Sequence, residues 1–379
     1  MYFDKNIKTK KKRIAVLFGG QSTEHEISLR SSINVIQAIS QRKYDLTLIG
    51  VDKSGRWILY NNQDCLLNAN NPSSICLLPI SRYLAVVPGY LKPQLIDISS
   101  GLPLPLIDVI FPVLHGGNGE NGSVQGLLQL LNIPFIGSSV LGSAICMDKD
   151  MTKRILRDAG IPVTPSITLL RSNNIMKNIN VIFEKIGGLP LFIKPASQGS
   201  SIGVSKVINL NDFREAILLA FQYDTKILIE KEINGREIEV AILGNDLPEV
   251  SVCGEVFTGD TFYTYKTKYF EEFKAELPAK IPIPISRSIQ EIAKKAYLAL
   301  NCSIMARVDF FLTSQGQIFL NEVNTLPGFT SISMYPKLWE ASGLDFTLLM
   351  DRLISLALAR NVTTKPKLQV KKDKYKLPI

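Results

Sequence analysis

The sequence is poor in the residues that most often build metal and redox centres. Among 379 residues only two are histidine and five are cysteine. The cysteines are widely spaced and form no Cys-x-x-Cys pair, which argues against a disulfide framework or a zinc site and favours a reducing compartment. Two histidines, His25 and His115, are too few for a histidine-based metal site. Both follow predicted strands in polar or glycine-rich loops, where site residues often lie.

Long apolar runs are also missing. None approaches the roughly 20 residues that a membrane-spanning helix needs. The run 14–18, after the lysine-rich start, is shorter than the core of a signal peptide, about 7–15 residues. The chain is 46% hydrophobic and 20% charged, as soluble globular proteins are. We therefore expect a cytoplasmic protein with no membrane partner, long enough for two or three domains.

The net charge of +9 is concentrated at the two ends of the chain. Residues 1–13 and 363–379 each carry six lysine or arginine residues against one aspartate, so the body between them is close to neutral. Such charge runs are usually solvated tails, and we expect basic tails at 1–12 and 363–379 with no nucleic-acid partner.

Hydrophobic patterning predicts three α/β segments between the tails. In residues 13–148 we expect buried strands at 14–18, 44–51, 107–114 and 133–136 and helices at 28–39 and 123–131, which is the pattern of an open parallel sheet. Residues 57–106 show weak periodicity and are expected to be irregular. In residues 149–250 we expect a smaller domain with a helix at 151–159, strands at 191–194 and 203–207, a helix at 211–222 and strands at 227–230 and 237–243. In residues 251–362 we expect helices at 286–300 and 344–358 and strands at 305–312 and 317–323.

The last two strands are expected to form a hairpin with a turn centred on residues 315 and 316. In that register Asp309 opposes Glu322, and Arg307 opposes Asn324. Because side chains alternate along a strand, all four then share one face. Two carboxylates and an amide make an oxygen-only site, which suits Mg²⁺. The alternative is an exposed ion pair across the strands.

A second candidate site follows the strand that ends at Lys194. The loop after it is rich in glycine and serine, including Ser200, Ser201 and Gly203. Backbone N–H groups and hydroxyls of such a loop can surround phosphate oxygens while the lysine supplies charge. The P-loop motif is absent, and a plain flexible hairpin is the alternative.

Three further segments carry polar residues at places where sites form. Gly117, Gly119 and Gly122 match the spacing of a dinucleotide fingerprint, but the acidic residue expected about 20 positions later is missing, which favours a helix N-terminus that binds a substrate carboxylate. Glu24 follows the first strand and either binds a substrate ammonium or belongs to a helix capping box. The segment 263–270 contains three tyrosines and is either a lid over a site or an ordinary strand.

Taken together, these segments resemble the D-alanine–D-alanine ligases of the ATP-grasp superfamily. Eight motifs occur in family order: Gly-Gly-x-Ser-x-Glu-x-Glu-Ile-Ser, His-Gly-x-x-Gly-Glu-x-Gly, Met-Asp-Lys, Lys-Pro followed by Gly-Ser-Ser-x-Gly, Ile-Glu-Lys, Lys-Tyr, Arg-x-Asp-Phe and Asn-Glu-x-Asn-Thr-x-Pro-Gly-Phe-Thr. They span residues 13 to about 360. The resemblance implies a three-domain ATP-grasp fold with an N-terminal open parallel-sheet domain.

The resemblance also implies a role for individual residues. ATP would be bound by Lys149, Lys194, Ser201, Glu230, Lys231, Ile233 and Glu237. Two Mg²⁺ ions, replaceable by Mn²⁺, would be held by Asp309, Glu322 and Asn324. Glu24 would bind the first alanine, with Ser200 and Tyr269 hydrogen-bonded to it, and His115 would lie beside the substrate carboxylate. Ser333 and Met334 would dock the second alanine.

The implied reaction joins two D-alanine molecules through a D-alanyl phosphate, for peptidoglycan precursors. Lys268 and Arg307 would offset the charge of the transferred phosphoryl group, and Arg307 with the Gly328 N–H would stabilise the oxyanion. The family suggests a homodimer. Two alternatives stay open: a ligase that joins D-alanine to D-lactate, which Tyr269 disfavours, and a grasp-fold protein that only binds nucleotide.

Overall fold

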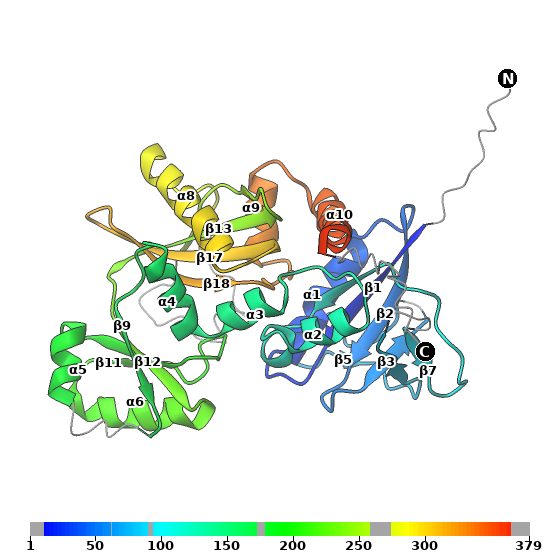
Figure 1. Cartoon of the computed structure of the whole chain (residues 1–379), viewed down its shortest axis with the longest axis horizontal. Helices are drawn as coiled ribbons and strands as arrows, with labels where there is room; N and C mark the ends of the chain where they lie inside the picture. The colour runs from blue at the N-terminus through cyan, green and yellow to red at the C-terminus, as the bar shows by residue number, and fades with distance from the viewer. Residues whose placement is uncertain (1–10, 62, 90–93, 173–178, 258–273, 365–379) are drawn as a thin grey trace, which may run out of the picture.

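The computed structural model describes residues 11–61, 63–89, 94–172, 179–257 and 274–364. Figure 1 shows the N-terminal sheet at one end of the molecule and two further sheets at the other end, with helix α3 (Val140–Met147) between the two ends and helix α4 (Lys149–Asp158) between the two further sheets. Within the described residues, every helix is too short or too polar to cross a lipid bilayer.

The N-terminal sheet has the strand order β3-β2-β1-β8. β1 (Lys12–Gly19) lies parallel to β2 (Tyr44–Val51) and β8 (Val109–Val113), as expected for an open parallel sheet, and β3 (Trp57–Tyr60) is an antiparallel edge strand. The apolar run of β1 is fully buried because helices α1 (His25–Ala38) and α2 (Ser123–Leu130) and the C-terminal helix pack around it.

Two expectations for this segment are wrong. Residues 57–106 contain β3 and two small antiparallel pairs, β4 (Leu66–Leu67) with β5 (Cys76–Leu77) and β6 (Leu84–Val86) with β7 (Leu95–Asp97). Strands this short show too few alternations to give a period-2 signal. Conversely, the strand expected at 133–136 is reduced to a single bridge between Ile110 and Phe135.

The second sheet is antiparallel, with the order β11-β10-β12-β9. It contains β9 (Ser166–Leu170), β10 (Leu191–Pro195), β11 (Ser205–Val207) and β12 (Lys226–Lys231), and helices α5 (Ile179–Ile186) and α6 (Leu210–Tyr223) pack on it. The side chain of Asn209 caps α6 by accepting hydrogen bonds from two backbone N–H groups, which fixes the start of that helix.

The third sheet has the order β16-β15-β13-β17-β18, with β14 paired to β13. Its strands are β13 (Gly235–Gly244), β14 (Glu249–Val250), β15 (Gly254–Phe257), β16 (Lys274–Glu276), β17 (Ile304–Thr313) and β18 (Ile318–Asn324), and α8 (Ile283–Ala299) packs on it. The expected boundary at residue 250 would place β13 with the second sheet. Because β13 pairs with β17 along its whole length, we propose that the boundary lies between β12 and β13.

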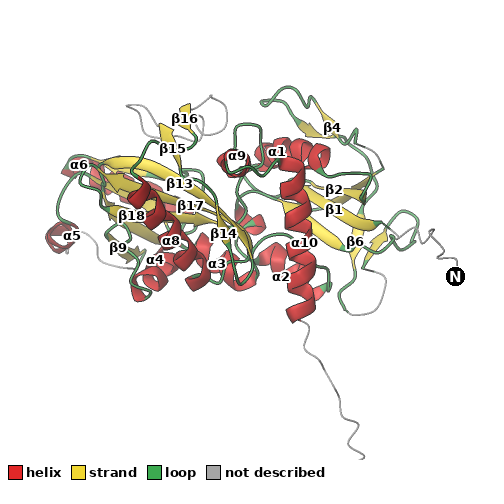
Figure 2. Ribbon diagram, turned by 90° about the horizontal axis from the view of Figure 1, so that it is seen from above, coloured by secondary structure: helices red, strands yellow, loops and turns green. Residues whose placement is uncertain are grey.

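The chain returns to its N-terminal sheet at the end. After α9 (Met334–Ala341), helix α10 (Phe346–Thr364) contacts α1 and β8 (Figure 2), and residues of α9 and α10 share one hydrophobic core with β1 and β8. Phe329 meets the ring of Phe111 edge-on at 5.3 Å. Helices α3, α5 and α9, each 8 residues long, have no counterpart among the predicted elements.

Arg360 of α10 connects the two halves of the chain. Its guanidinium donates to the carbonyls of Phe135 and Gly137 and to the hydroxyl of Ser303, which precedes β17. Burial lowers the pKa of Arg360 to about 10, so the group stays charged at neutral pH. Removing the guanidinium would take one hydrogen-bond donor from each of the carbonyls of Phe135 and Gly137, in a largely buried position.

Arg360→Leu is therefore expected to lower the free energy of unfolding by about 2 kcal/mol or more, since each unsatisfied buried group costs roughly 1–3 kcal/mol. Urea unfolding measures the loss. Arg352→Leu on the same helix is the matched control, because Arg352 makes an exposed ion pair with Glu249 and such pairs contribute about 0–1 kcal/mol. Equal losses in the two variants would contradict the assignment.

Candidate functional site

The hairpin of β17 and β18 places four polar side chains on one face. Arg307 pairs with Asn324 and Asp309 pairs with Glu322, as expected, but the turn is not centred where the sequence suggested. Near the turn Leu312 pairs with Ile318, and the register shifts by one residue between Asp309 and Phe310. Asn321 is the extra residue of this β-bulge. The bulge turns Glu322 toward Asp309; without it Glu322 would face the opposite side of the sheet.

Arg307 is the centre of a buried charge network. Its Nε and Nη2 donate to the two oxygens of Asp309 at 2.8 and 2.7 Å. Its Nε also lies 3.1 Å from Oε2 of Glu239, which faces Asp309 from the neighbouring strand β13. Burial alone lowers the pKa of Arg307, but the charges of Asp309 and Glu239 raise it well above its ordinary value. The alternative to a metal site was an exposed ion pair across the strands. Arg307 and Asp309 do form an ion pair, but both lie on β17 and the pair is buried.

The same hairpin offers only oxygen atoms to a metal. Among the described residues, no three histidine, cysteine, aspartate or glutamate side chains form a metal-binding group by themselves, so a metal here also needs the amide oxygen of Asn324. That amide donates from Nδ2 to Asp309 at 3.0 Å and to Glu322 at 3.5 Å. The donor set suits Mg²⁺ once the Asn324 amide turns its oxygen toward the metal. Asp309 can bind a metal while it accepts from Arg307, because each of its carboxylate oxygens has two lone pairs.

A pocket between the N-terminal sheet and the hairpin collects many of the candidate residues. One side is lined by Glu24 and His115, and the loop between β10 and β11, which we call the flap, contributes Ser200. The other side is lined by Arg307, Asn324, Gly328, Ser333 and Met334. The imidazole Nε2 of His115 lies 2.9 Å from the hydroxyl of Ser31. The hydroxyl of Ser200 donates to the carboxylate of Glu24, as expected. These residues come from segments as far apart in the sequence as Glu24 and Met334, which the fold brings together.

Glu24 does not act as a helix cap. It occupies the N-cap position of α1 but makes no side-chain capping bond, and Ser22 accepts only from the Glu24 N–H. Its carboxylate lies instead against Gly116, where a Cβ would come within 2.4 Å of Oε2. Gly116 has φ +67°, so both its conformation and its neighbour favour glycine. The capping-box alternative is therefore wrong.

Gly116→Ala should lower the free energy of unfolding by at least about 1 kcal/mol more than Gly101→Ala. Both glycines have nearly the same φ, +67° and +68°, so both substitutions add backbone strain of roughly 1–3 kcal/mol. Only at Gly116 must the new methyl group displace Glu24, since a Cβ at Gly101 would have no atom within 4 Å. Urea unfolding compares them, and equal losses would show that Glu24 does not approach Gly116 this closely.

The glycine motif that follows His115 does not build a dinucleotide turn. A 3₁₀ turn at Gly117–Gly119 separates β8 from α2, and Gly122 with φ +97° precedes α2. A nicotinamide fingerprint needs the strand to pass directly into the helix. The N-terminus of α2 contributes Ser123 to a neighbouring pocket that also contains His115 and Gly116.

The flap after β10 has an unusual backbone. Ser200 and Ser201 both adopt left-handed conformations, with φ +52° and +58°, which non-glycine residues rarely do outside functional loops. The flap is tied to α4, because Lys149 donates its N–H to Ala196 at 2.9 Å and its Nζ to the carbonyl of Gln198 at 2.6 Å. Lys149, Ser200, Glu322 and Asn324 line one small pocket.

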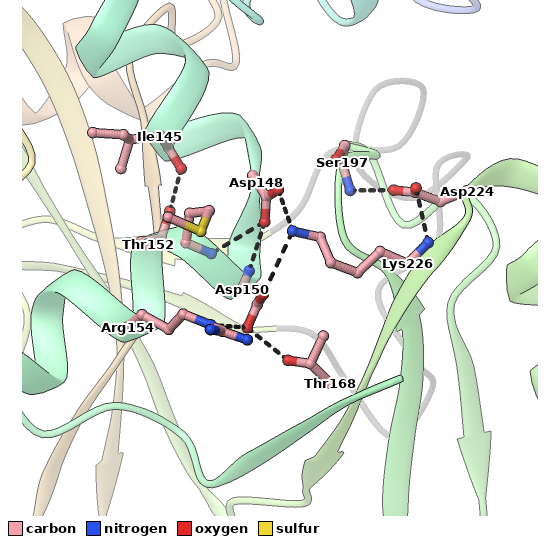
Figure 3. Close-up of polar contacts among 10 residues, drawn as sticks. Ile145, Asp148, Asp150, Thr152, Arg154, Thr168, Ser197, Asp224 and Lys226 are labelled. Atoms are coloured by element: carbon pink, nitrogen blue, oxygen red, sulfur yellow. Dashed lines mark hydrogen bonds and ion pairs between the residues drawn. The ribbon is translucent and has the colours of Figure 1, made fainter. Parts of the chain in front are cut away.

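The start of α4 is held by charged side chains on both sides of Lys149 (Figure 3). Asp148 caps the helix by accepting from the N–H groups of Asp150 and Met151 and also pairs with Lys226 of β12. Asp150 accepts from Arg154 at 2.9 Å and from Thr168 of β9 at 2.6 Å. These bonds fix the position of Lys149 relative to the second sheet.

Lys194 and Glu230 form a buried pair on neighbouring strands. Nζ of Lys194 lies 2.7 Å from Oε2 of Glu230. Within the described residues Oε1 accepts no well-aligned hydrogen bond, although the ammonium of Lys153 is 3.1 Å away. A buried acceptor of this kind suits a ligand that donates an N–H group, such as an adenine amine. Burial raises the pKa of Glu230, but Lys153 and Lys194 outweigh it and hold that pKa below its ordinary value.

The remaining nucleotide candidates lie along the connection between β12 and β13. Lys231 ends β12 and is exposed, Ile233 is half-buried in the connection, and Glu237 lies on β13, half-buried on the same face as Glu239. The structure thus places them at the junction of the second and third sheets.

The far side of the pocket is the start of α9. Ser333 is its N-cap residue and Met334 its first residue, and both line the pocket. The first N–H groups of a helix have no acceptor within the helix, so an anion is favoured there. The Ser333 hydroxyl lies 2.8 Å from that of Thr330 and accepts from the Thr330 N–H. Gly328 packs closely beside it, since a Cβ there would come within 2.7 Å of the Ser333 hydroxyl.

Family models match both parts of the chain. Residues 13–138 match the family described as D-ala D-ala ligase N-terminus, and residues 155–355 match the D-ala D-ala ligase C-terminus. The chain belongs to the D-alanine–D-alanine ligase family.

Curated members of this ligase family are similar over almost their whole length. A D-alanine–D-alanine ligase of Sodalis glossinidius is 66% identical over 351 residues, which cover 92% of this chain and 96% of the relative. D-alanine–D-alanine ligase A of Escherichia coli K12 is 52% identical, covering 93% and 97%.

Solved structures of ligases have the same fold. The D-alanine–D-alanine ligase of Coxiella burnetii has a TM-score of 0.80 at 37% identity, covering 93% of this chain and 97% of that one. The VanG D-Ala:D-Ser ligase of Enterococcus faecalis has a TM-score of 0.78 at 38% identity, covering 92% and 100%. The expected mixed α/β ATP-grasp architecture is therefore confirmed.

Two charged residues of these networks, Glu239 and Lys153, are not among the site residues predicted from the sequence. Glu239 follows Glu237 by two positions on β13, where it alternates with the apolar Ile238 and Val240, and this alternation was the available signal. Lys153 follows Lys149 by one helical turn on α4, which places both on one face. Two expected site residues, Lys268 and Tyr269, lie outside the described residues, as does the segment 263–270.

Proposed function

We propose that this protein joins two D-alanine molecules to D-alanyl-D-alanine at the expense of ATP, through a D-alanyl phosphate, in the synthesis of peptidoglycan precursors. The observation that carries the proposal is the single pocket that joins the Glu24–Ser200 pair, Arg307 and the N-terminus of α9. It provides an anion for an ammonium group, a cation for a phosphoryl group and N–H donors for a carboxylate. The names of the similar curated ligases support the choice of substrate.

The first D-alanine is proposed to bind with its ammonium on Glu24. The carboxylate of Glu24 is 5% exposed, so its attraction for an ammonium group is weakly screened by water. The hydroxyl of Ser200 keeps the carboxylate oriented, and Tyr269 is proposed to complete this hydrogen-bonded set. His115, fixed by Ser31, stands beside the carboxylate of the substrate.

The nucleotide is proposed to lie between the second and third sheets. Lys149, Lys194 and the flap residue Ser201 would bind the phosphates, and Glu230, Lys231 and Ile233 would line the adenine pocket, with Glu237 on the ribose. The flap conformation supports this arrangement, because the strained Ser200 and Ser201 turn their backbone N–H groups into a tight loop of the kind that binds phosphate.

Magnesium is proposed as the cofactor, with two ions at Asp309, Glu322 and Asn324 and Mn²⁺ able to replace them. When bound, the metal neutralises charge on the phosphate oxygens. Arg307, with Lys268, would stabilise the phosphoryl group as it moves to the alanine carboxylate. A carboxylate is a poor electrophile, so this phosphorylation creates a leaving group.

The second D-alanine is proposed to dock its carboxylate on Ser333 and Met334 at the start of α9. Its amine then attacks the acyl phosphate carbonyl, and Arg307 and the Gly328 N–H stabilise the resulting oxyanion. The phosphate leaves when the tetrahedral intermediate collapses. A homodimer and a cytoplasmic location are further proposals that rest on the family resemblance.

The direct test incubates the purified protein with ATP, Mg²⁺ and D-alanine. Phosphate release should require all three together, and each phosphate should accompany one molecule of D-alanyl-D-alanine, because the acyl phosphate is consumed by the second amine. Phosphate assay and mass spectrometry measure both products. ATP binding without phosphate release that depends on D-alanine would favour a nucleotide-binding protein without ligase activity.

The second substrate is tested in the same assay by adding D-lactate or D-serine with D-alanine across a range of pH. D-Alanyl-D-alanine should dominate at neutral pH. Preferential formation of D-alanyl-D-lactate would establish the alternative ligase, and preferential D-alanyl-D-serine would match the named activity of the Enterococcus faecalis relative.

Glu322→Gln should reduce turnover by more than about 100-fold, beyond the 10–100-fold that loss of a supporting partner of a metal site causes. The dissociation constant for ATP should change much less, because the lysines that bind phosphate stay in place. Steady-state kinetics and a fluorescent-nucleotide titration separate these quantities. Glu291→Gln, at an exposed site on α8, is the control; turnover near wild type in Glu322→Gln would exclude the metal assignment.

A further inference from the structure

Lys153 of α4 is a buried lysine to which the proposed reaction gives no role. Its side chain is 1% exposed, and burying an ammonium group is costly unless it is paired. Nζ lies 3.1 Å from Oε1 of Glu230, whose other oxygen is 2.7 Å from Lys194. One buried carboxylate thus lies between two ammonium groups that come from different elements.

Lys153 also contacts the hairpin of β17 and β18, which carries the proposed metal ligands. Its Nζ lies 3.5 Å from the backbone carbonyl of Asn321, the bulge residue whose insertion turns Glu322 toward Asp309. The contact is long for a hydrogen bond, but it joins a charge to a carbonyl inside the protein, where such attractions are stronger than in water. Lys153 therefore touches the second sheet through Glu230 and the third sheet through Asn321.

The anchoring of α4 makes Lys153 a rigid part of the site. Asp148 and Asp150 hold the first turn of the helix on β12 and β9 (Figure 3). Lys149 and Lys153 are four residues apart, so they leave the same face of α4. One contacts the flap carbonyl of Gln198 and the other contacts Glu230.

We propose that Lys153 is a positioning residue for the nucleotide. It shares the charge of Glu230, so that Lys194 stays available to the phosphates of ATP. It also fixes the residues proposed to bind the nucleotide relative to the hairpin of β17 and β18. The inference rests on the proposed ATP-dependent function. Without Lys153, Lys194 would be the only cation close to the buried Glu230 among the described residues, and Glu230 would hold it more tightly. The pKa of Lys153 agrees with this, since burial lowers it to about 8 while Glu230 opposes the fall, which leaves the group mostly charged at pH 7.

The test is Lys153→Met, which keeps the length of the side chain and removes its charge. The dissociation constant for mant-ADP, measured by fluorescence on the full-length protein without D-alanine, should rise on the order of 10-fold, the effect of losing one charged hydrogen bond. The KM for ATP should rise in parallel, whereas the KM for D-alanine should stay within about twofold, because the Glu24 pocket is untouched.

Four further variants make the result specific. Lys185→Met removes a charge from the exposed face of α5 and should leave mant-ADP binding unchanged. Lys153→Arg retains the charge and should recover most of the affinity. If Lys153→Met fails to fold, the double variant Lys153→Met, Glu230→Gln is used instead, because it removes both charges of the pair; the proposal expects it to bind mant-ADP more weakly than Glu230→Gln alone.

The outcomes separate this inference from the proposed function. Wild-type mant-ADP affinity in Lys153→Met, or in the double variant relative to Glu230→Gln, would overturn the inference even if the protein makes D-alanyl-D-alanine. An equal rise in the KM for ATP and for D-alanine would also overturn it, since it indicates general damage. Weaker mant-ADP binding in a protein that makes no dipeptide would sustain the role of Lys153 and reject the ligase function.

Discussion

The buried guanidinium of Arg307 is the constraint around which the site is built. A charge at this depth is tolerated because Asp309 binds it through two hydrogen bonds and Glu239 faces it from the next strand. The same arrangement orients Asp309, since both of its oxygens accept hydrogen bonds from Arg307. Each carboxylate oxygen has a second lone pair, so a metal would share Asp309 with the arginine. The β-bulge at Asn321 completes the arrangement by bringing Glu322 to the same face.

Among the residues proposed to bind the nucleotide, too, each buried charge lies next to an opposite charge. Glu230, 3% exposed, is surrounded by Lys153 and Lys194, so the negative charge of the carboxylate and the positive charges of the lysines stabilise one another. The network leaves more positive than negative charge among these three groups, which favours an anionic ligand. Helix α4 links it to the flap through Lys149, and the ion pairs at the start of that helix keep the link rigid.

The pocket forms where the N-terminal sheet meets the segment that contains α9 and α10. Helix α10 packs into the core of the N-terminal sheet, Arg360 bonds to the loop after Phe135, and Phe329 packs on Phe111. These contacts bring Glu24 of the first segment within reach of Ser200 and of the hairpin. The substrate side and the nucleotide side of the site are therefore held together by contacts remote from the chemistry.

Local patterns in the sequence determined the long elements and the polar residues of the site. An uninterrupted apolar run identified β1, largely apolar segments identified β2 and β17, and the mixture of Asp309, Glu322 and Asn324 indicated an oxygen-only site, because these properties depend on neighbours along the chain. The tertiary structure alone decided that β13 belongs to the third sheet, that a bulge at Asn321 sets the register, and that Lys153 and Glu239 join the charge networks. Strand pairing and the burial of charge depend on residues distant in sequence, so no local pattern encodes them.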